Sequence, residues 1–179
     1  MEEIKRLGRE LKYEGVLVNI YADTMELPDG KTVQWDFIHH DGAAAVVPVR
    51  DDGKILMVRQ YRNALDRATL EIPAGKVDRA GEPKVECARR ELEEETGYRC
   101  ENLEYLISLN TTVALCDELI EIYVAPNLIP SRQHLDADEY VDVEAWDLDE
   151  LCRMIYAGEL RDSKTVAAIL AYKVKYGKE

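Results

Sequence analysis

The chain contains 179 residues, of which 46% are hydrophobic and 33% are charged. This length and apolar fraction suit one folded domain, or one domain with a small extension. The 36 acidic and 23 basic residues give a net charge of −13 at pH 7. That charge argues against a nucleic-acid partner, because phosphate backbones require a basic surface. An anionic substrate would need local arginines and a metal ion to offset it.

Other features of the sequence bear on its compartment. No apolar run of about 18 residues is present, so we expect no membrane-spanning segment and no membrane partner. The first 15 residues lack the apolar core of a signal peptide. The four cysteines form no C-x-x-C pair, a usage typical of reduced thiols. We therefore expect a cytoplasmic protein.

The first 41 residues predict a small antiparallel β-sheet. Residues 16–21 have the composition of a strand, and residues 32–38 alternate apolar and polar side chains in the manner of a second strand. Between them, Pro28-Asp29-Gly30 is a turn signal. We therefore divide the chain into an N-terminal β-sheet extension, residues 1–41, and a main domain, residues 42–179.

Strands and helices alternate irregularly in the main domain. Residues 43–49 form a nearly continuous apolar run typical of a buried strand, and residues 54–60 are expected to return beside it as a hairpin. Further strands are expected at residues 70–72, 103–109, 119–125 and 141–146, and helices at residues 83–96, 147–157 and 163–176. This order of elements predicts an α/β fold in which helices cover both faces of a mixed sheet.

The helix expected at residues 83–96 carries the most informative pattern. One stripe of its surface would face a core and consists of Val85, Ala88, Leu92 and Thr96. Glu91, Glu94 and Glu95 fall on an adjacent stripe. Glu91 and Glu95 lie one turn apart without a basic residue at the helical spacings of three or four, so they should repel each other.

Two interpretations of this acidic pair are open. In the first it belongs to a solvated helix face, and in the second a divalent cation binds between the two carboxylates. Mg²⁺ takes carboxylate and carbonyl oxygens, and it usually completes its coordination shell with substrate phosphates. The second interpretation therefore predicts a phosphate-bearing substrate.

The surrounding sequence decides between these interpretations. Nine residues form a wider pattern, namely Gly75, Glu82, Arg90, Glu91, Leu92, Glu94, Glu95, Gly97 and Tyr98. This pattern resembles the Nudix box, which is a glycine, five residues, a glutamate, seven residues and then R-E-U-x-E-E-x-G-U, where U is bulky and apolar. Six residues separate Gly75 from Glu82, which we interpret as a one-residue insertion in a turn at residues 78–81. The resemblance implies the Nudix α/β/α sandwich.

Other segments resemble the ADP-ribose pyrophosphatase branch of that family. They are R-Q-Y-R at residues 59–62, L-E-I-P-A-G at residues 70–75, D-S-K-T at residues 162–165 and the N-terminal sheet. The resemblance implies hydrolysis of the pyrophosphate bond of ADP-ribose, or of a similar nucleoside diphosphate sugar, to AMP and a sugar phosphate. It also implies Mg²⁺ as the cofactor, with Mn²⁺ as the alternative ion. In this branch the N-terminal extension helps to build a homodimer whose two subunits line the substrate cleft.

The resemblance assigns roles to the acidic residues. Glu91 and Glu95 would be the main metal ligands, with Glu94, Glu82 and the backbone carbonyl of Ala74 as further ligands. A general base is expected outside the helix, because carboxylates bound to a metal accept protons poorly. In this branch the base lies on the loop before the last core strand.

That position corresponds to Glu139, which we expect to act in catalysis together with Glu94. The alternative for Glu139 is an ordinary exposed loop carboxylate.

The resemblance also implies substrate contacts. Arg62 is expected to clamp a phosphate with its planar fork of donors, and Arg59 belongs to the same segment. Trp35 would stack on the adenine, unless it is a packed residue of the N-terminal sheet. Glu71 is expected to contact the ribose or its phosphate.

The loop at residues 110–118 departs from the branch. Val113-Ala114 stands where ADP-ribose members carry Pro-Gly, so the sugar or base preference is less fixed than the reaction type. GDP-mannose or another nucleotide sugar is the alternative substrate. Outside the enzyme class, the alternatives are a non-catalytic Nudix domain that senses a nucleotide, and an acidic scaffold with a structural Ca²⁺ or Mg²⁺.

Overall fold

The structure is a computed structural model, and it describes residues 3–16, 18–77, 81–137 and 139–177. The chain divides into two compact units, residues 1–42 with 110–119, and residues 43–109 with 120–179. The boundary expected after residue 41 therefore lies one residue before the boundary between the units. The sequence did not indicate that residues 110–119 belong with the N-terminal unit.

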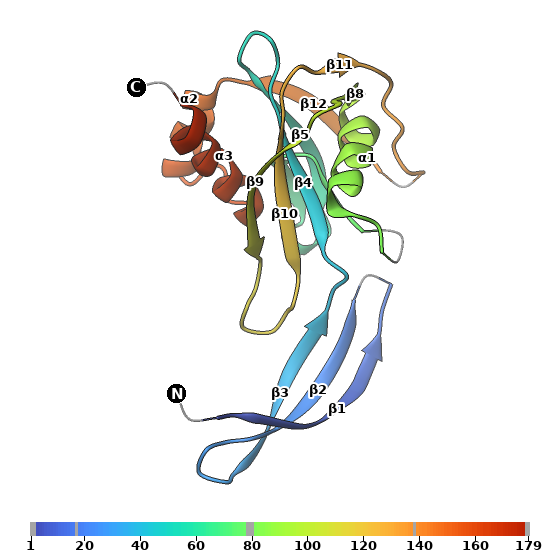
Figure 1. Cartoon of the computed structure of the whole chain (residues 1–179), viewed down its shortest axis with the longest axis vertical. Helices are drawn as coiled ribbons and strands as arrows, with labels where there is room; N and C mark the ends of the chain where they lie inside the picture. The colour runs from blue at the N-terminus through green and yellow to red at the C-terminus, as the bar shows by residue number, and fades with distance from the viewer. Residues whose placement is uncertain (1–2, 17, 78–80, 138, 178–179) are drawn as a thin grey trace. The chain divides into compact units, whose positions relative to one another are not determined.

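The first unit contains a three-stranded antiparallel sheet, as predicted (Figure 1). Its strands are β1 (Lys5–Glu14), β2 (Asn19–Glu26) and β3 (Thr32–His39), in that spatial order. β3 matches the expected strand, whereas β2 begins later than the strand expected at residues 16–21, of which residue 17 lies outside the described residues. β1 was not predicted, because all ten of its residues are exposed and charged side chains dominate it. Segment 110–119 joins this unit through a hydrogen bond from Ile38 N to Leu115 O, at 2.7 Å.

The second unit is built on two β-sheets. The mixed sheet has the order β7-β4-β10-β9, and its strands are β4 (Ala43–Pro48), β7 (Ala74–Lys76), β9 (Glu104–Asn110) and β10 (Leu119–Ala125). The antiparallel sheet has the order β12-β5-β6, and its strands are β5 (Ile55–Arg62), β6 (Arg67–Glu71) and β12 (Val141–Trp146). A short 3₁₀ helix, η1 (Asn63–Leu65), joins β5 to β6. Two further strands, β8 (Tyr98–Arg99) and β11 (Ile129–Pro130), pair with each other. They were not predicted, because a strand of only two residues is too short to show a periodic pattern.

The predicted hairpin of residues 43–49 and 54–60 is wrong. β4 pairs in parallel with β10 and antiparallel with β7, whereas β5 pairs with β6 and β12. Within the described residues, β4 and β5 are joined by a turn and by one isolated bridge, between Val49 and Ile55. Every residue of β4 and the first four residues of β5 are buried, so each strand occupies the centre of its own sheet.

Helices cover both faces of the mixed sheet, which confirms the predicted α/β/α sandwich (Figure 1). They are α1 (Lys84–Thr96), α2 (Leu148–Tyr156) and α3 (Ser163–Tyr176). Side chains alternate along β4: Ala44 and Val46 pack with the α1 cluster, whereas Ala45 and Val47 pack with residues of α2 and α3. A strand buried on both faces needs apolar residues at every position, which explains the run that the sequence shows.

The ends of the helices show which local signals were reliable. Gly97 ends α1 with φ 72°, as predicted, and Asp162 caps α3 by accepting a hydrogen bond from Thr165 N at 3.0 Å. Asp147 precedes α2 as predicted, but its side chain makes no cap hydrogen bond and instead pairs with Lys54 at 3.4 Å. Tertiary pairing therefore replaced the expected cap.

Two compositional expectations can be compared with the structure. All four cysteines are free, as expected for reduced thiols. Among the described residues, no helix combines the length and apolar character that crossing a bilayer requires.

Candidate functional site

Helix α1 presents two buried carboxylates to the loop at β7. Glu91 is 9% exposed and Glu95 is 2% exposed. The backbone N–H of Ala74 donates to Glu95 Oε2 at 2.9 Å. A Cβ placed on Gly75 would overlap the carboxylate of Glu91, so any larger residue would displace either that carboxylate or the β7 backbone. The structure therefore brings together Ala74, Glu91 and Glu95, three of the expected metal ligands, beside Gly75.

Glu91 has a countercharge that the helical spacings of three and four did not indicate. Arg90 Nη1 donates to Glu91 Oε1 at 2.6 Å and to Glu94 Oε2 at 2.9 Å, and Arg90 Nε lies 3.4 Å from Glu82 Oε1. Helical spacing alone did not reveal this pair, because the two residues are adjacent in sequence and the long arginine side chain folds back. Arg90 therefore pairs with three glutamates, Glu82, Glu91 and Glu94.

The surroundings of Glu91 and Glu95 disfavour their charged forms. Burial raises the pKa of Glu95 to about 8, and repulsion by Glu91 and Glu139 contributes to that shift. Burial also raises the pKa of Glu91 to about 7, although Arg90 acts in the opposite direction. Two desolvated carboxylates one turn apart would both be stabilised in the ionised form by an added cation.

The chemistry of these groups fits a hard divalent cation. The donors are carboxylate and carbonyl oxygens, the type that Mg²⁺ prefers. The guanidinium of Arg90 already occupies the position of a cation among Glu82, Glu91 and Glu94. Within the described part of the chain, no three acidic, histidine or cysteine side chains form a ready-made metal cluster. A bound ion would therefore depend on oxygen ligands from the backbone and the substrate as well.

Glu139 lies on the loop before β12, as predicted, and its side chain is exposed. Its carboxylate accepts a hydrogen bond from the backbone N–H of Asp136 at 3.2 Å. Glu139 also raises the pKa values of Glu91 and Glu95 by repulsion, so its charge acts on the acidic face of α1. Its role as a base stays a prediction.

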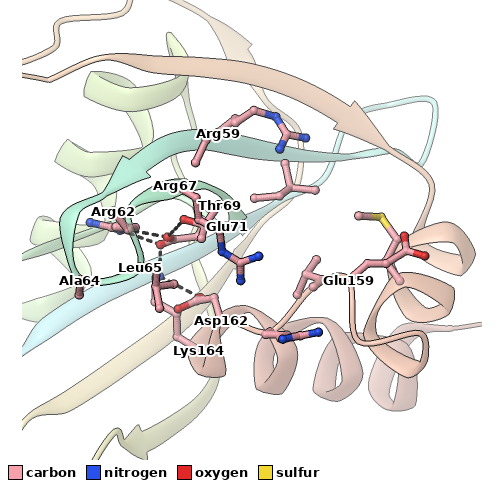
Figure 2. Close-up of a pocket in the computed structure, with 15 residues that line it drawn as sticks. Arg59, Arg62, Ala64, Leu65, Arg67, Thr69, Glu71, Glu159, Asp162 and Lys164 are labelled. Atoms are coloured by element: carbon pink, nitrogen blue, oxygen red, sulfur yellow. Dashed lines mark hydrogen bonds and ion pairs between the residues drawn. The ribbon is translucent and has the colours of Figure 1, made fainter.

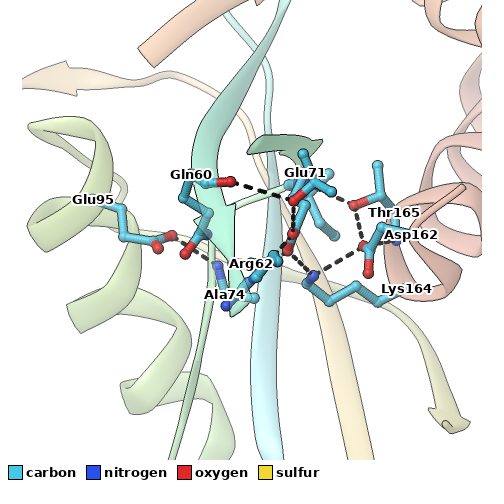
Figure 3. Close-up of polar contacts among 10 residues, drawn as sticks. Gln60, Arg62, Glu71, Ala74, Glu95, Asp162, Lys164 and Thr165 are labelled. Carbon is cyan, nitrogen blue, oxygen red and sulfur yellow. Dashed lines mark hydrogen bonds and ion pairs between the residues drawn. The ribbon is translucent and has the colours of Figure 1, made fainter. Parts of the chain in front are cut away.

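A second carboxylate, that of Glu71, is buried but fully engaged. Arg62 Nε donates to Glu71 Oε1 at 2.8 Å and Arg62 Nη2 donates to Glu71 Oε2 at 2.6 Å (Figure 3). Thr69 Oγ1 and Lys164 Nζ donate to the same carboxylate. Burial raises the pKa of Glu71, but hydrogen bonds from Arg62 and the charge of Lys164 outweigh this and hold it at about 2. The expected contact of Glu71 with ribose stays a prediction, and here the carboxylate fixes Arg62.

The network around Glu71 continues into α3. Lys164 Nζ also lies 2.9 Å from Asp162 Oδ2, and Thr165 Oγ1 donates to the same oxygen at 2.6 Å. The backbone N–H of Ile72 donates to Thr165 Oγ1 at 2.9 Å. The sequence analysis assigned no role in the site to Asp162, Lys164 and Thr165, although the D-S-K-T segment at the start of α3 was the available signal.

Gln60 was also missed by the sequence analysis. Its Nε2 is buried and has no hydrogen-bond partner among the described residues. Gln60 precedes Arg62 by two positions on β5, so both side chains leave the strand on the same face (Figure 3). Buried polar groups are rarely left unpaired, so this amide is a candidate donor to a ligand.

The two remaining predicted substrate contacts lie in different units. Arg59 Nε donates to Glu144 Oε1 at 2.5 Å, across the β5–β12 pair. Trp35 belongs to β3 of the first unit, is 47% exposed, and lines a cavity of about 500 Å³ with Ala114 and Leu115. Its role in stacking stays a prediction.

The fold and the acidic helix define a Nudix hydrolase. The NUDIX domain family model matches residues 39–169, and the chain belongs to this family. The crystal structure of an ADP compounds hydrolase superposes with a TM-score of 0.86 at 21% sequence identity, covering 99% of this chain and 98% of that one, which supports the fold.

Two relatives with higher sequence identity show which members of the family the chain resembles. The ADP-ribose pyrophosphatase of Bacillus subtilis (strain 168) is 37% identical over 97% of this chain and 94% of the relative. The methanol dehydrogenase activator of Bacillus methanolicus is 43% identical over 93% of this chain and 91% of the relative. The chain is thus an enzyme of the Nudix hydrolase family with ADP-ribose pyrophosphatases among its relatives.

Proposed function

We propose that the protein hydrolyses the pyrophosphate bond of ADP-ribose, or of a similar nucleoside diphosphate sugar, and releases AMP and a sugar phosphate. The observation that carries this proposal is the buried pair Glu91 and Glu95 against the glycine loop of β7. A pyrophosphate bears crowded negative charge, and such a substrate needs a cation beside it. The similarity to an ADP-ribose pyrophosphatase supports the choice of substrate class.

The metal in this proposal is Mg²⁺, with Mn²⁺ as the alternative. Glu91 and Glu95 would hold it, with Glu94, Glu82 and the carbonyl of Ala74 as further ligands. When bound, such an ion neutralises phosphate charge and activates water. Arg90 keeps Glu91 and Glu94 aligned from the side, through contacts at 2.6 and 2.9 Å.

Protein groups outside α1 orient the substrate and move the proton. Glu139 accepts the proton of the attacking water, because it is exposed and is not itself a proposed metal ligand. The Nε and Nη2 atoms of Arg62 are committed to Glu71, which leaves Nη1 for a phosphate oxygen. Gln60 Nε2 supplies a further donor for that phosphate.

The remaining assignments concern the nucleoside and the assembly. Trp35 offers an exposed aromatic face for stacking on the adenine. Arg59, which its bond to Glu144 holds in place on β5, would contact the same substrate. We place the enzyme in the cytoplasm as a homodimer in which the N-terminal extension provides the subunit contact.

A direct assay tests the proposal. Purified protein is incubated with ADP-ribose and Mg²⁺, and AMP is detected by chromatography. AMP release that requires the metal and is abolished by EDTA is the expected result. A panel of GDP-mannose and other nucleotide sugars tests the substrate, because Val113-Ala114 leaves that preference open. Nucleotide binding without turnover of any compound would instead favour a non-catalytic sensing domain.

A second candidate function follows from the relative that is 43% identical over 93% of this chain and is named a methanol dehydrogenase activator. In this case the partner would be a methanol dehydrogenase. The test adds the protein to such an enzyme and measures its rate with methanol. An increase in this rate with the wild-type protein, and no increase with a heat-inactivated sample, would support this candidate function.

A further inference from the structure

A cavity lies between the β5–β6 hairpin and the connection from α2 to α3, within the second unit (Figure 2). Its volume is about 510 Å³, which falls in the range of small-molecule sites. One wall is formed by residues 59–71 and the other by residues 154–164. The proposed reaction uses Arg59 and Arg62 on the first wall of this cavity and assigns no role to the opposite wall.

The carboxylates that line the cavity are already neutralised. Glu71 is engaged by Arg62 and Lys164. Asp162 accepts hydrogen bonds from the backbone and hydroxyl of Thr165, and it also pairs with Lys164. Glu159 Oε1 lies 3.2 Å from Arg153 Nη1. No lining carboxylate is therefore left to neutralise an additional cation.

Two arginines of the lining, one on each wall, lack such compensation. Arg67 and Arg161 are exposed, and neither has a carboxylate partner within the described ranges. Arg161 Nε donates to the carbonyl of Gly158, which carries no net charge. Both guanidiniums thus remain available to an anion, in a chain whose net charge is −13.

The position of Arg67 on β6 adds to the evidence for an anion beside this residue. Arg67 stands directly opposite Arg62 in the β5–β6 ladder. Arg62 is already paired with Glu71 at 2.6 Å, whereas Arg67 has no carboxylate partner in the described part of the chain. The carboxylate of Asp66, next in sequence, is hydrogen-bonded to the hydroxyl of Tyr61 at 2.6 Å and not to Arg67. An anion between Arg67 and Arg161 would supply the partner that Arg67 lacks.

We propose that this cavity is a binding site for a phosphomonoester, held by Arg67 and Arg161 from opposite walls. A guanidinium binds phosphate oxygens through a planar fork of donors. Two uncompensated positive charges match a phosphomonoester, which carries close to two negative charges at neutral pH. Leu65, Met154 and Leu160 supply apolar surface for the carbon skeleton of a sugar or nucleoside.

Calorimetric titration with AMP and with ribose 5-phosphate tests the proposal, in EDTA so that no metal at α1 contributes. The choice of these probes rests on the proposed function, which would release one product of each kind. We expect the wild type to bind at least one of them. Arg67→Gln and Arg161→Gln should each weaken binding by about tenfold or more, because each removes one guanidinium fork. Arg50→Gln is the matched control, since it removes an exposed arginine on the β4–β5 turn.

Absence of binding at millimolar ligand in the wild type would overturn the proposal. So would binding that survives both substitutions, or an equal loss in Arg50→Gln, which would indicate a general charge effect. Circular dichroism spectra confirm that each variant is folded. ADP-ribose turnover is measured separately on the same samples. Binding without turnover would keep this site and remove the proposed function, and turnover without binding would do the reverse.

Discussion

Glu71 and Glu95 are equally withdrawn from water, each being 2% exposed, but they differ in their surroundings. Burial raises the pKa of both carboxyls. For Glu71, donors from Arg62, Lys164 and Thr69 outweigh burial and hold the pKa at about 2. For Glu95, the hydrogen bond from Ala74 is insufficient, and the pKa rises to about 8. A buried carboxylate with converging donors stays ionised, whereas one without them gains a proton unless a cation is added, which is the role that we propose for Glu95.

The largest expected effect is on catalysis at Glu95. Glu95→Gln removes a proposed metal ligand but keeps the shape and the acceptor for the Ala74 N–H. We expect turnover of ADP-ribose to fall by at least about 10²-fold, since even residues that only support metal ligands cost 10- to 100-fold. The melting temperature in EDTA should not fall, because the amide replaces a carboxyl whose charged form burial disfavours. Turnover is measured as AMP released per minute.

Glu86→Gln is the control for this prediction. Glu86 lies on the same helix and pairs on the surface with Arg89 at 3.4 Å. Its turnover should equal that of the wild type, because a surface ion pair contributes little. Full activity in Glu95→Gln would contradict the assignment of the metal ligands.

The same substitution at Glu71 should act on stability instead. Glu71→Gln leaves Arg62 and the buried Lys164 without their shared countercharge. Breaking a buried ion pair from one side costs about 3–5 kcal/mol, which we expect as the loss in free energy of unfolding. Urea denaturation followed by circular dichroism measures it. The exposed pair Glu150 and Arg153 provides the comparison, and Glu150→Gln should leave the free energy of unfolding nearly unchanged.

The two glutamates should also give opposite pH dependences in EDTA. Between about pH 4.5 and pH 8, the folded protein retains protons on Glu91 and Glu95 that the unfolded chain has lost, so stability falls as pH rises. Between about pH 4.5 and about pH 2, Glu71 is protonated in the unfolded chain but still ionised in the folded protein. The stability of the fold therefore falls as the pH falls through this range. Each group contributes at most about 1.4 kcal/mol per pH unit.

Urea titrations across this pH range test both slopes. Glu95→Gln should flatten the slope above pH 4.5, and Glu71→Gln should flatten the slope below it. A wild-type protein whose stability rises steadily from pH 5 to pH 8 without metal would contradict this difference between the two sites.

The smallest expected effect is at Trp35. Trp35→Ala removes an exposed aromatic surface without opening a core, so the fold should be unchanged. Loss of one stacking contact should raise the KM for ADP-ribose by roughly 5- to 150-fold, corresponding to about 1–3 kcal/mol. Trp35→Phe should retain most of the affinity. An unchanged KM in Trp35→Ala would show that the base does not stack there.

The acidic helix could be predicted from the sequence because its signals are local. The spacing of Ala88, Leu92 and Thr96 gave the buried stripe, and Gly97 gave the end of the helix. The resemblance to a family motif then named Glu91 and Glu95. Gly75 could be recognised only as a motif position, and the structure supplies the reason, which is the contact with the Glu91 carboxylate.

The features that could not be predicted depend on tertiary structure. Apolar runs in β4 and β5 do not reveal which sheet each strand joins, so the predicted hairpin was wrong. The pairing of Lys164 with Glu71 joins residues 93 positions apart, and no sequence pattern links them. Helical spacing also concealed the contact between Arg90 and Glu91. In each case the partner is set by packing and not by local periodicity.

We propose that Glu91 and Glu95 bind a divalent cation, and calorimetric titration of Mg²⁺ at pH 7 with a non-hydrolysable ADP-ribose analogue present is the sharpest test of this proposal. We expect the wild type to bind Mg²⁺ and to release protons into the buffer, because the pKa values of about 7 and about 8 leave these carboxyls partly protonated. We also expect Glu95→Gln to lose most of this binding. Equal binding by the two proteins, with no proton released, would contradict it.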